Sequence, residues 1–203
     1  MIKHNMLSLI INNALLYDEE LNNKNILFVL SDYSQIETYF NGSKYKHLIG
    51  IVSPLSGHEF YEKCISHTLR HTECTFRADG CTGLKLQVIN QLINIAKTAK
   101  MAGVFDGNRV NLQTDKLVGN TRATVGFVKD RKYYVPNTLL REDIRDVAQK
   151  PTKKIIAVAV KGINDRFYTD FSYISDSLSE SELSELSNLL CDLFENGLLD
   201  LSR

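Results

Sequence analysis

Alternating apolar and polar positions between residues 109 and 173 predict a sheet around which the rest of the chain is arranged. Short runs in this stretch place an apolar side chain at every second position, which is typical of half-buried strands. The runs predict five strands, at residues 110–114, 121–129, 132–136, 153–161 and 166–174.

The same alternation assigns side chains to the two faces of the predicted sheet. In the second strand, Ala123, Val125 and Phe127 point to one face, and in the fifth strand Phe167 and Phe171 do the same. The opposite face carries the polar side chains of both strands, namely Arg122, Thr124, Arg166, Tyr168 and Asp170. We therefore expect one face to pack on helices and the other to present polar and basic groups to solvent or a ligand.

Helical patterns surround this sheet. Apolar residues at helical spacing predict helices at residues 2–22, 56–69, 83–102 and from 179 onwards, and a short charged helix at 137–147. Capping boxes mark two of the starts, Ser56 with Glu59 and Ser179 with Glu182. Gly103 marks the end of the helix at 83–102. Two apolar runs at residues 25–31 and 34–40 predict a further hairpin.

Chain length and charge refine this picture. The 203 residues fit one domain, divided into an N-terminal helix (1–24), a core (25–175) and an acidic C-terminal helix (176–203). The formal net charge is zero, but residues 97–166 hold 15 Lys or Arg against 7 Asp or Glu. Residues 168–203 hold 8 acidic residues against one arginine. The pattern therefore predicts a basic sheet and an acidic helix within a neutral chain.

The cysteines and the apolar runs bear on location. Four cysteines occur without a secretory signal, because asparagines interrupt the apolar run at residues 1–16 and no small-residue cleavage site follows it. This favours reduced thiols in the cytoplasm. No apolar run approaches the ~20 residues that span a bilayer. We expect a soluble, cytoplasmic protein.

One cluster of cysteine and histidine raises the possibility of zinc. Five residues within 18 positions have side chains that zinc prefers, namely Cys64, His67, His71, Cys74 and Cys81. Their spacing is not that of a zinc finger, and no CxxC pair is present. The alternative places Cys64 in the core and the histidines on a solvated helix end. No thiol is singled out as a nucleophile, and neither GxGxxG nor GxxxxGK[ST] occurs, so we predict no metal and no cofactor.

The remaining constellation combines one histidine with the polar sheet face. Metal-free RNA cleavage needs a base for the 2′-hydroxyl proton, an acid for the leaving oxygen and cations for the phosphate. His47 is the candidate acid or base, because histidine titrates near neutral pH. Arg122, Lys161 and Arg166 are candidates to hold the phosphate. Thr124 and Tyr168 are candidates to add hydroxyl hydrogen bonds, and Tyr133 and Tyr134 are candidates to stack on a base. The alternative is that His47 is a half-buried structural residue and the others are ordinary strand residues.

The segment KYKHLIGIVSPLSGHEFYEKC carries a resemblance to a known family. Its His47, Leu48, Gly50, Phe60 and Tyr61 are similar to a motif of the phage-associated Barnase/EndoU/colicin/RelE-like nucleases. Later pieces follow in the family's order, namely the helix at 83–102, a GF strand at Gly126-Phe127, YYVP at 133–136, a short helix and a closing hairpin. The resemblance covers roughly residues 25 to 175.

This resemblance implies an α+β fold, with helices packed on one face of a curved, mainly antiparallel sheet of about four to six strands. It also implies metal-independent RNA cleavage on the other face, by a toxin-like hydrolase of a phage or mobile-element conflict system. RNA is the expected partner, and the acidic C-terminal helix is a candidate contact for a protein inhibitor. We expect His47, Arg122, Thr124, Lys161 and Tyr168 to be catalytic. The alternative function is a non-catalytic module that binds RNA or protein in phage defence or counter-defence.

Overall fold

The computed structural model describes residues 4–109, 112–169 and 171–195. Ten strands are present in these ranges: β1 (Lys24–Leu30), β2 (Gln35–Phe40), β3 (Ile51–Val52), β4 (Thr75–Phe76), β5 (Met101–Val104), β6 (Lys116–Gly119), β7 (Thr124–Asp130), β8 (Tyr133–Leu140), β9 (Lys153–Gly162) and β10 (Phe171–Ile174). The α-helices are α1 (His4–Glu20), α2 (Tyr45–Leu48), α3 (Gly57–Ile65), α4 (Cys81–Gln87), α5 (Ile89–Ile93), α6 (Ile95–Thr98) and α7 (Glu180–Leu190). Short 3₁₀ turns occupy Gly42–Lys44, His71–Glu73, Ile144–Asp146 and Cys191–Leu193.

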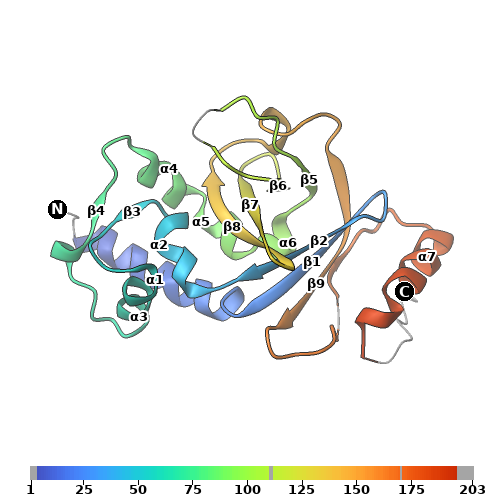
Figure 1. The fold of residues 1–203 in the computed structure, drawn as a ribbon, viewed down its shortest axis with the longest axis horizontal. Coiled ribbons are helices and arrows are strands. Elements are labelled where there is room, and N and C mark those ends of the chain that lie inside the picture. The colour runs from blue at the N-terminus through green and yellow to red at the C-terminus, as the bar shows by residue number, and fades with distance from the viewer. Residues whose placement is uncertain (1–3, 110–111, 170, 196–203) are drawn as a thin grey trace.

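Seven strands close into a barrel (Figure 1). Their order is β1-β2-β8-β7-β6-β5-β9, and β9 pairs with β1 to complete the ring. β10 adds to β9 outside the ring, and β3 pairs with β4 in a separate two-stranded sheet. The β2–β8 contact is parallel, whereas the other pairings in the ring are antiparallel. Closure leaves the barrel without a free edge.

The barrel interior forms one core with the N-terminal helices. Ile26 and Phe28 of β1 and Phe127 of β7 are fully buried and belong to the same apolar cluster as Tyr17 of α1 and Leu92 of α5. The odd-numbered side chains of β1, such as Leu27, point outward into a second cluster formed with α7. β1 is therefore apolar on both faces, which explains its unbroken run of apolar residues.

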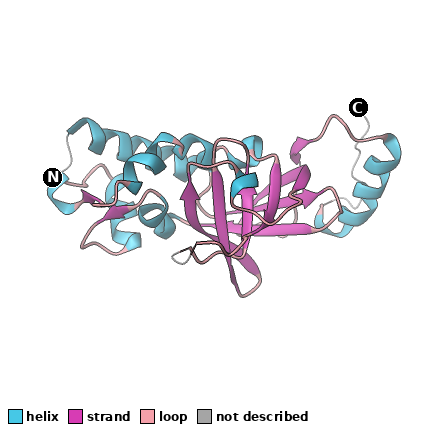
Figure 2. Ribbon diagram, turned by 90° about the horizontal axis from the view of Figure 1, so that it is seen from above, coloured by secondary structure: helices cyan, strands magenta, loops and turns pink. Residues whose placement is uncertain are grey.

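Helices cover the barrel on two opposite sides. Figure 2 shows α1 to α4 on the side of the N-terminus and α7 on the other. The side chains of Leu186 and Leu190 anchor α7 on the outer face of β1 and β9. Both predicted capping boxes are confirmed, since Ser56 with Glu59 begins α3 and Ser179 with Glu182 begins α7.

The expected fold class is wrong in its central feature. We predicted a curved, mainly antiparallel sheet of about four to six strands with helices packed on one face, whereas the main sheet has eight strands, seven of them in a closed barrel. The difference arises from short strands that leave little periodicity. β5 and β6 have four residues each, and β5 lies where the helix at 83–102 was expected to end.

Several predicted elements have other boundaries. The helix at 83–102 is divided into α4, α5 and α6, with non-helical backbone at Val88 and Asn94. The prediction of a charged helix at 137–147 is wrong, because β8 continues to Leu140 and only the 3₁₀ turn at Ile144–Asp146 follows. Of the first expected strand, residues 110 and 111 lie outside the described residues, and residues 112–114 are not a strand. The fifth is shortened to β10.

Other predictions are confirmed. The N-terminal helix, the hairpin of β1 with β2, and the strand at 153–161 all occur at the expected positions. No helix among the described residues has the length and apolar character to cross a membrane.

Candidate active site

His47 lies on the exposed side of α2, a single helical turn whose opposite side packs into the core. Tyr45 and Leu48 of this turn are fully buried, and the Tyr45 hydroxyl donates a hydrogen bond of 2.7 Å to the carbonyl oxygen of Ile10 in α1. The chain approaches α2 through Gly42, where a Cβ atom would lie 2.1 Å from the Tyr61 ring. This contact excludes a side chain at residue 42, so the backbone that leads into α2 packs directly against the Tyr61 ring.

A second element, α4, brings Lys85 to His47. The Lys85 ammonium donates a hydrogen bond of 3.3 Å to the main-chain carbonyl oxygen of His47. Thr82, which is fully buried one turn earlier, holds α4 in place. Its hydroxyl donates to the Gly50 carbonyl oxygen over 2.5 Å and accepts from the Arg77 amide over 3.1 Å. Two segments that are 38 residues apart in sequence therefore meet at one site.

The charges around His47 favour its neutral form. Partial burial lowers the pKa of His47 most, and the positive charges of Lys85, Lys44 and Arg77 lower it further. A hydrogen bond to the main chain of Asn137 in β8 acts in the opposite direction. The result is a pKa below the ordinary histidine value, so the imidazole is available as a proton acceptor at neutral pH.

Lys85 is the cation best placed to act with His47. Burial lowers the pKa of the Lys85 ammonium below the usual lysine value, and the charge of Arg77 contributes in the same direction. The Arg77 guanidinium is already engaged, because its Nε donates to the Asp79 carboxylate over 3.0 Å. The hydrogen bond from the Cys81 amide, followed by the pairing with Arg77, lowers the pKa of Asp79 to about 2. Burial raises the pKa of the Cys81 thiol, which disfavours a thiolate nucleophile here.

Lys161, Arg166 and Tyr168 form a second group on the outer face of β1, β2 and β9. The Lys161 ammonium donates to the Arg166 carbonyl oxygen over 3.1 Å and lies 4.6 Å from the centre of the Tyr168 ring. The Tyr168 hydroxyl donates to the Glu37 carboxylate over 3.0 Å. Burial, followed by the Glu37 charge, raises the pKa of Tyr168, so this phenol is protonated at neutral pH.

Tyr133 and Tyr134 lie at the start of β8, each beside a lysine. The Tyr133 ring is 6.5 Å from the ring of Tyr39 in β2, and the Lys132 ammonium lies 5.2 Å from its centre. The Lys129 ammonium lies 4.4 Å from the centre of the Tyr134 ring. Tyr133 is only partly buried, so basic and aromatic groups alternate at this surface.

The structure contradicts the predicted exposure of Thr124 and Tyr168 on the polar face. Thr124 is fully buried, and its hydroxyl donates to the Glu142 carbonyl oxygen over 3.0 Å. Arg122 is exposed in the turn before β7 and belongs to neither of the groups described above. Tyr168 also differs from the expected exposure, because its ring packs against Phe194 together with Phe171. Alternation failed here because the 3₁₀ turn at Ile144–Asp146 and the segment after α7 cover the outer face of the barrel.

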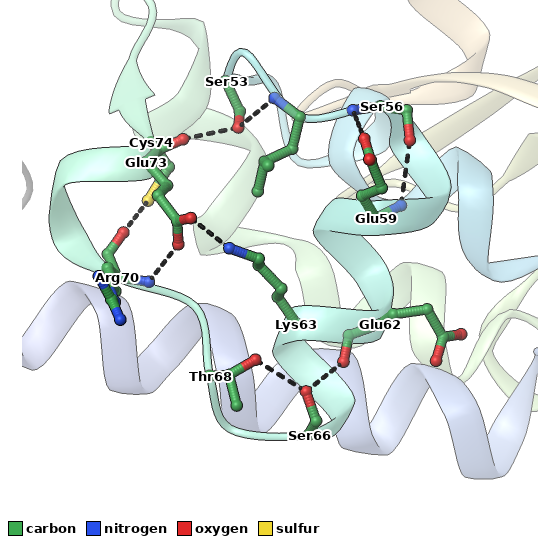
Figure 3. Close-up of polar contacts among 11 residues, drawn as sticks. Ser53, Ser56, Glu59, Glu62, Lys63, Ser66, Thr68, Arg70, Glu73 and Cys74 are labelled. Atoms are coloured by element: carbon green, nitrogen blue, oxygen red, sulfur yellow. Dashed lines mark hydrogen bonds and ion pairs between the residues drawn. The ribbon is translucent and has the colours of Figure 1, made fainter.

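The cysteine and histidine segment is held by an ion pair and by hydrogen bonds. Lys63 and Glu73 form an ion pair, and the Glu73 carboxylate also accepts from the Arg70 amide over 2.8 Å (Figure 3). Cys64 and Cys74 are buried free thiols. Within residues 4–109, 112–169 and 171–195, no three His, Cys, Asp or Glu side chains are grouped closely enough to hold a metal ion.

Lys85 is the residue that sequence reasoning missed. It belongs to the predicted helix at 83–102, where a charged residue is expected to lie on the solvated face. The only available signal is the loop and glycine at residues 77–80, which allow α4 to turn back toward α2. Nothing in the spacing of Lys85 and His47 predicts their contact.

Comparison with known proteins points to one family. The model of the family described as phage-Barnase-EndoU-ColicinE5/D-RelE like nuclease 4 matches residues 9–177. The match extends the resemblance seen in the sequence into α1 and contains α2, α4 and the whole barrel. Neither a curated protein nor a solved structure matches the chain.

Proposed function

The chain belongs to the phage-Barnase-EndoU-ColicinE5/D-RelE like nuclease 4 family, and from this membership we propose that it is a metal-independent endoribonuclease with its centre at His47 and Lys85. The family assignment gives a nuclease of the phage and toxin type. The choice of RNA, the reaction without a metal ion and the role of each residue are the proposal. The single observation that carries it is the contact between Lys85 and His47.

The proposed reaction uses the 2′-hydroxyl of RNA as the nucleophile. Neutral His47 takes the proton of this hydroxyl, and its oxygen forms a bond to phosphorus while the bond from phosphorus to the 5′-oxygen breaks. Lys85 stabilises the added negative charge and gives a proton to the leaving 5′-oxygen, for which its lowered pKa is suited. The products are a 2′,3′-cyclic phosphate and a free 5′-hydroxyl.

The surroundings of His47 support a reaction that needs no metal ion. The charged groups that influence its pKa are Lys85, Lys44 and Arg77, all of them cations. Cations provide the charge that a bound divalent ion would otherwise supply to the phosphate, and they repel such an ion.

Substrate binding is assigned to the aromatic and basic groups outside the barrel. Tyr133 and Asn137 belong to the same strand, β8, and four residues of strand span about 13 Å. A single strand that reaches from His47 along β8 would meet Tyr134 and then the ring of Tyr133. Lys161 and Arg166 extend this surface across β9 and are proposed to contact the backbone. Thr124 and Tyr168 are left out of this proposal because both side chains are buried, and Arg122 is left out because it lies in neither group.

A role in conflict between phage and host follows from the family and is proposed in the same way. Such a nuclease acts on RNA in the cytoplasm and needs an inhibitor in the cell that makes it. The acidic outer side of α7, with Glu180 and Glu185 exposed, is the candidate surface for a basic inhibitor. Toxicity on expression that disappears with His47→Ala supports this role, and equal toxicity of both proteins contradicts it.

The direct test is cleavage of matched substrates with and without EDTA. We expect single-stranded RNA to be cleaved in EDTA, while DNA of the same sequence stays intact because it has no 2′-hydroxyl. The RNA fragments should end in a 2′,3′-cyclic phosphate. Cleavage that requires a divalent ion, or equal cleavage of DNA, would overturn the proposal.

A further inference from the structure

A pocket that is separate from the His47 site lies at one mouth of the barrel. Its volume is about 260 Å³. It is formed where β1 and β5 end and where β2, β6 and β9 begin, together with the loop before β9. Three lysines line it, Lys116, Lys150 and Lys153. We refer to it as the lysine pocket.

Lys116 occupies a position where the barrel pattern calls for an apolar residue. It pairs across the strands with Phe127 on one side and with Val104 on the other. Residues paired in this way point to the same face, and Phe127 points into the fully buried core. The Lys116 side chain therefore points into the mouth of the barrel, two residues before the buried Val118 on the same face.

The positive charges in this pocket are only partly compensated. Lys153 forms an ion pair with Asp32, and the hydrogen bond from Lys153 lowers the pKa of that carboxyl to about 2. Among the described residues, neither Lys116 nor Lys150 has a carboxylate partner, and no acidic side chain lines the pocket. Ser34, Gln35 and Gln149 add neutral hydrogen-bonding groups to the lining. Uncompensated cations beside neutral donors are suited to an anion with several oxygen atoms.

The size and surroundings of the pocket favour one phosphate of a longer chain. Its volume is below the ~300–1,000 Å³ typical of sites that enclose a whole small molecule. A second, more open hollow of about 500 Å³ adjoins it and shares Lys150 and Pro151 with it. Arg145 lines this hollow together with one carboxylate, Asp146. The two hollows form a groove through which a chain could continue.

We propose that the lysine pocket binds a backbone phosphate of the single-stranded nucleic acid on which this nuclease acts. The inference rests on the proposed nuclease function but does not require His47 to be the catalytic base. The pocket supplies affinity through Lys116 and Lys150, and the open hollow beside it guides the neighbouring nucleotides. Backbone contacts of this kind carry no base preference.

Salt dependence of binding tests the proposal. Binding of a fluorescent RNA oligonucleotide, made uncleavable by 2′-O-methylation, is measured by anisotropy over a range of salt concentrations. We expect Lys116→Gln/Lys150→Gln to bind roughly tenfold more weakly at low salt. The magnitude of the slope of log affinity against log salt should fall by about 0.7, because the contact with one phosphate of a single strand is lost.

The control variant removes the same charge elsewhere. Lys24→Gln/Lys97→Gln changes two lysines that do not line either hollow, and it should keep the salt slope of the unchanged protein. If both double variants bind alike, or if the pocket variant binds like the unchanged protein, the proposal is overturned. Thermal unfolding of each variant verifies that the substitutions leave the fold intact.

Two further arms separate the sources of phosphate and the two proposals. A nucleoside monophosphate and inorganic phosphate are added as competitors, and competition at micromolar concentration would make the pocket a mononucleotide or phosphate site and overturn the assignment to a chain. If the protein cleaves no RNA but the pocket variant shows the reduced salt slope of binding, the proposed function fails and the proposal for the lysine pocket is upheld. If cleavage depends on His47 but the slope is unchanged, only the pocket fails.

Discussion

The Lys85 ammonium donates a hydrogen bond of 3.3 Å to the main-chain carbonyl oxygen of His47. This contact joins α4 to α2 and places a positive charge beside an imidazole whose pKa is already lowered by burial. The same lysine is itself half-buried, which lowers its own pKa. A proton acceptor and a proton donor with pKa values moved from their ordinary range are thus neighbours, as general acid–base catalysis requires.

Replacing Lys85 should shift the pH dependence of cleavage in a defined direction. The charge of Lys85 disfavours the imidazolium form, so Lys85→Gln raises the pKa of His47. Because the base must be neutral, the acidic limb of the rate profile moves to higher pH. The maximal rate should also fall by about 100-fold or more, since a donor to the transition state is lost. A pH profile of kcat/KM measures both effects.

Lys97→Gln is the matched control for this experiment. Lys97 is exposed on α6, and its charge is not among those that influence His47. Its removal should leave the acidic limb where it is. An acidic limb that stays unchanged in Lys85→Gln would show that the proton acceptor is a group other than His47.

Removing the His47 side chain should abolish cleavage without loss of the fold. We expect His47→Ala to lower the rate about 100- to 10,000-fold, the usual contribution of a general acid or base. The side chain is exposed on one side and has one hydrogen bond to the main chain of Asn137, so the free energy of unfolding should fall by about 1 kcal/mol or less. His58→Ala, at an exposed position of α3, is the control. Similar cleavage rates in the two variants would remove His47 from the mechanism.

Local signals allowed much of the secondary structure to be predicted from the sequence. The capping boxes at Ser56 and Ser179 each act within four residues, and both begin helices as expected. The strand at 153–161 was visible because its apolar run is long. His47 was identified as a candidate, and the structure leaves it exposed beside a cation.

Features that depend on contacts between distant segments could not be predicted. Closure of the barrel rests on β1 pairing with β9, which lies more than 120 residues away, and on one parallel contact between Thr38 and Tyr134. The alternation at Thr124 predicted an exposed hydroxyl, but the carbonyl of Glu142 covers it. Periodicity shows that two faces differ and does not show which later segment covers each face.

Tyr133 should contribute to binding of a nucleic acid through its ring. The side chain is partly exposed beside Tyr39 and Lys132, so a base can stack on it. Stacking on an aromatic ring contributes about 1–3 kcal/mol per base, so Tyr133→Ala should weaken binding of a single-stranded oligonucleotide roughly 5- to 150-fold. Tyr133→Phe keeps the ring and should bind within about twofold of the unchanged protein. Equal weakening in both variants would point to the hydroxyl and contradict stacking.

Thr82 should position Lys85, and Thr82→Val tests this without a change of shape. The buried hydroxyl joins the Gly50 carbonyl oxygen to the Arg77 amide, and valine leaves both without this partner. We expect the free energy of unfolding to fall by about 1–3 kcal/mol, measured by urea denaturation. Thr72→Val, at an exposed position, should change it by less than about 0.5 kcal/mol.

The catalytic readout separates positioning from stability alone. If Thr82 holds α4 against α2, Thr82→Val loosens the contact of Lys85 with His47, and the acidic limb of the pH profile moves up as in Lys85→Gln. Addition of Lys85→Gln to Thr82→Val should then cause little further shift, because the two substitutions act on one contact. A variant that is less stable but keeps the original pH profile under conditions where it is fully folded would show that Thr82 supports the fold and has no part in placing Lys85.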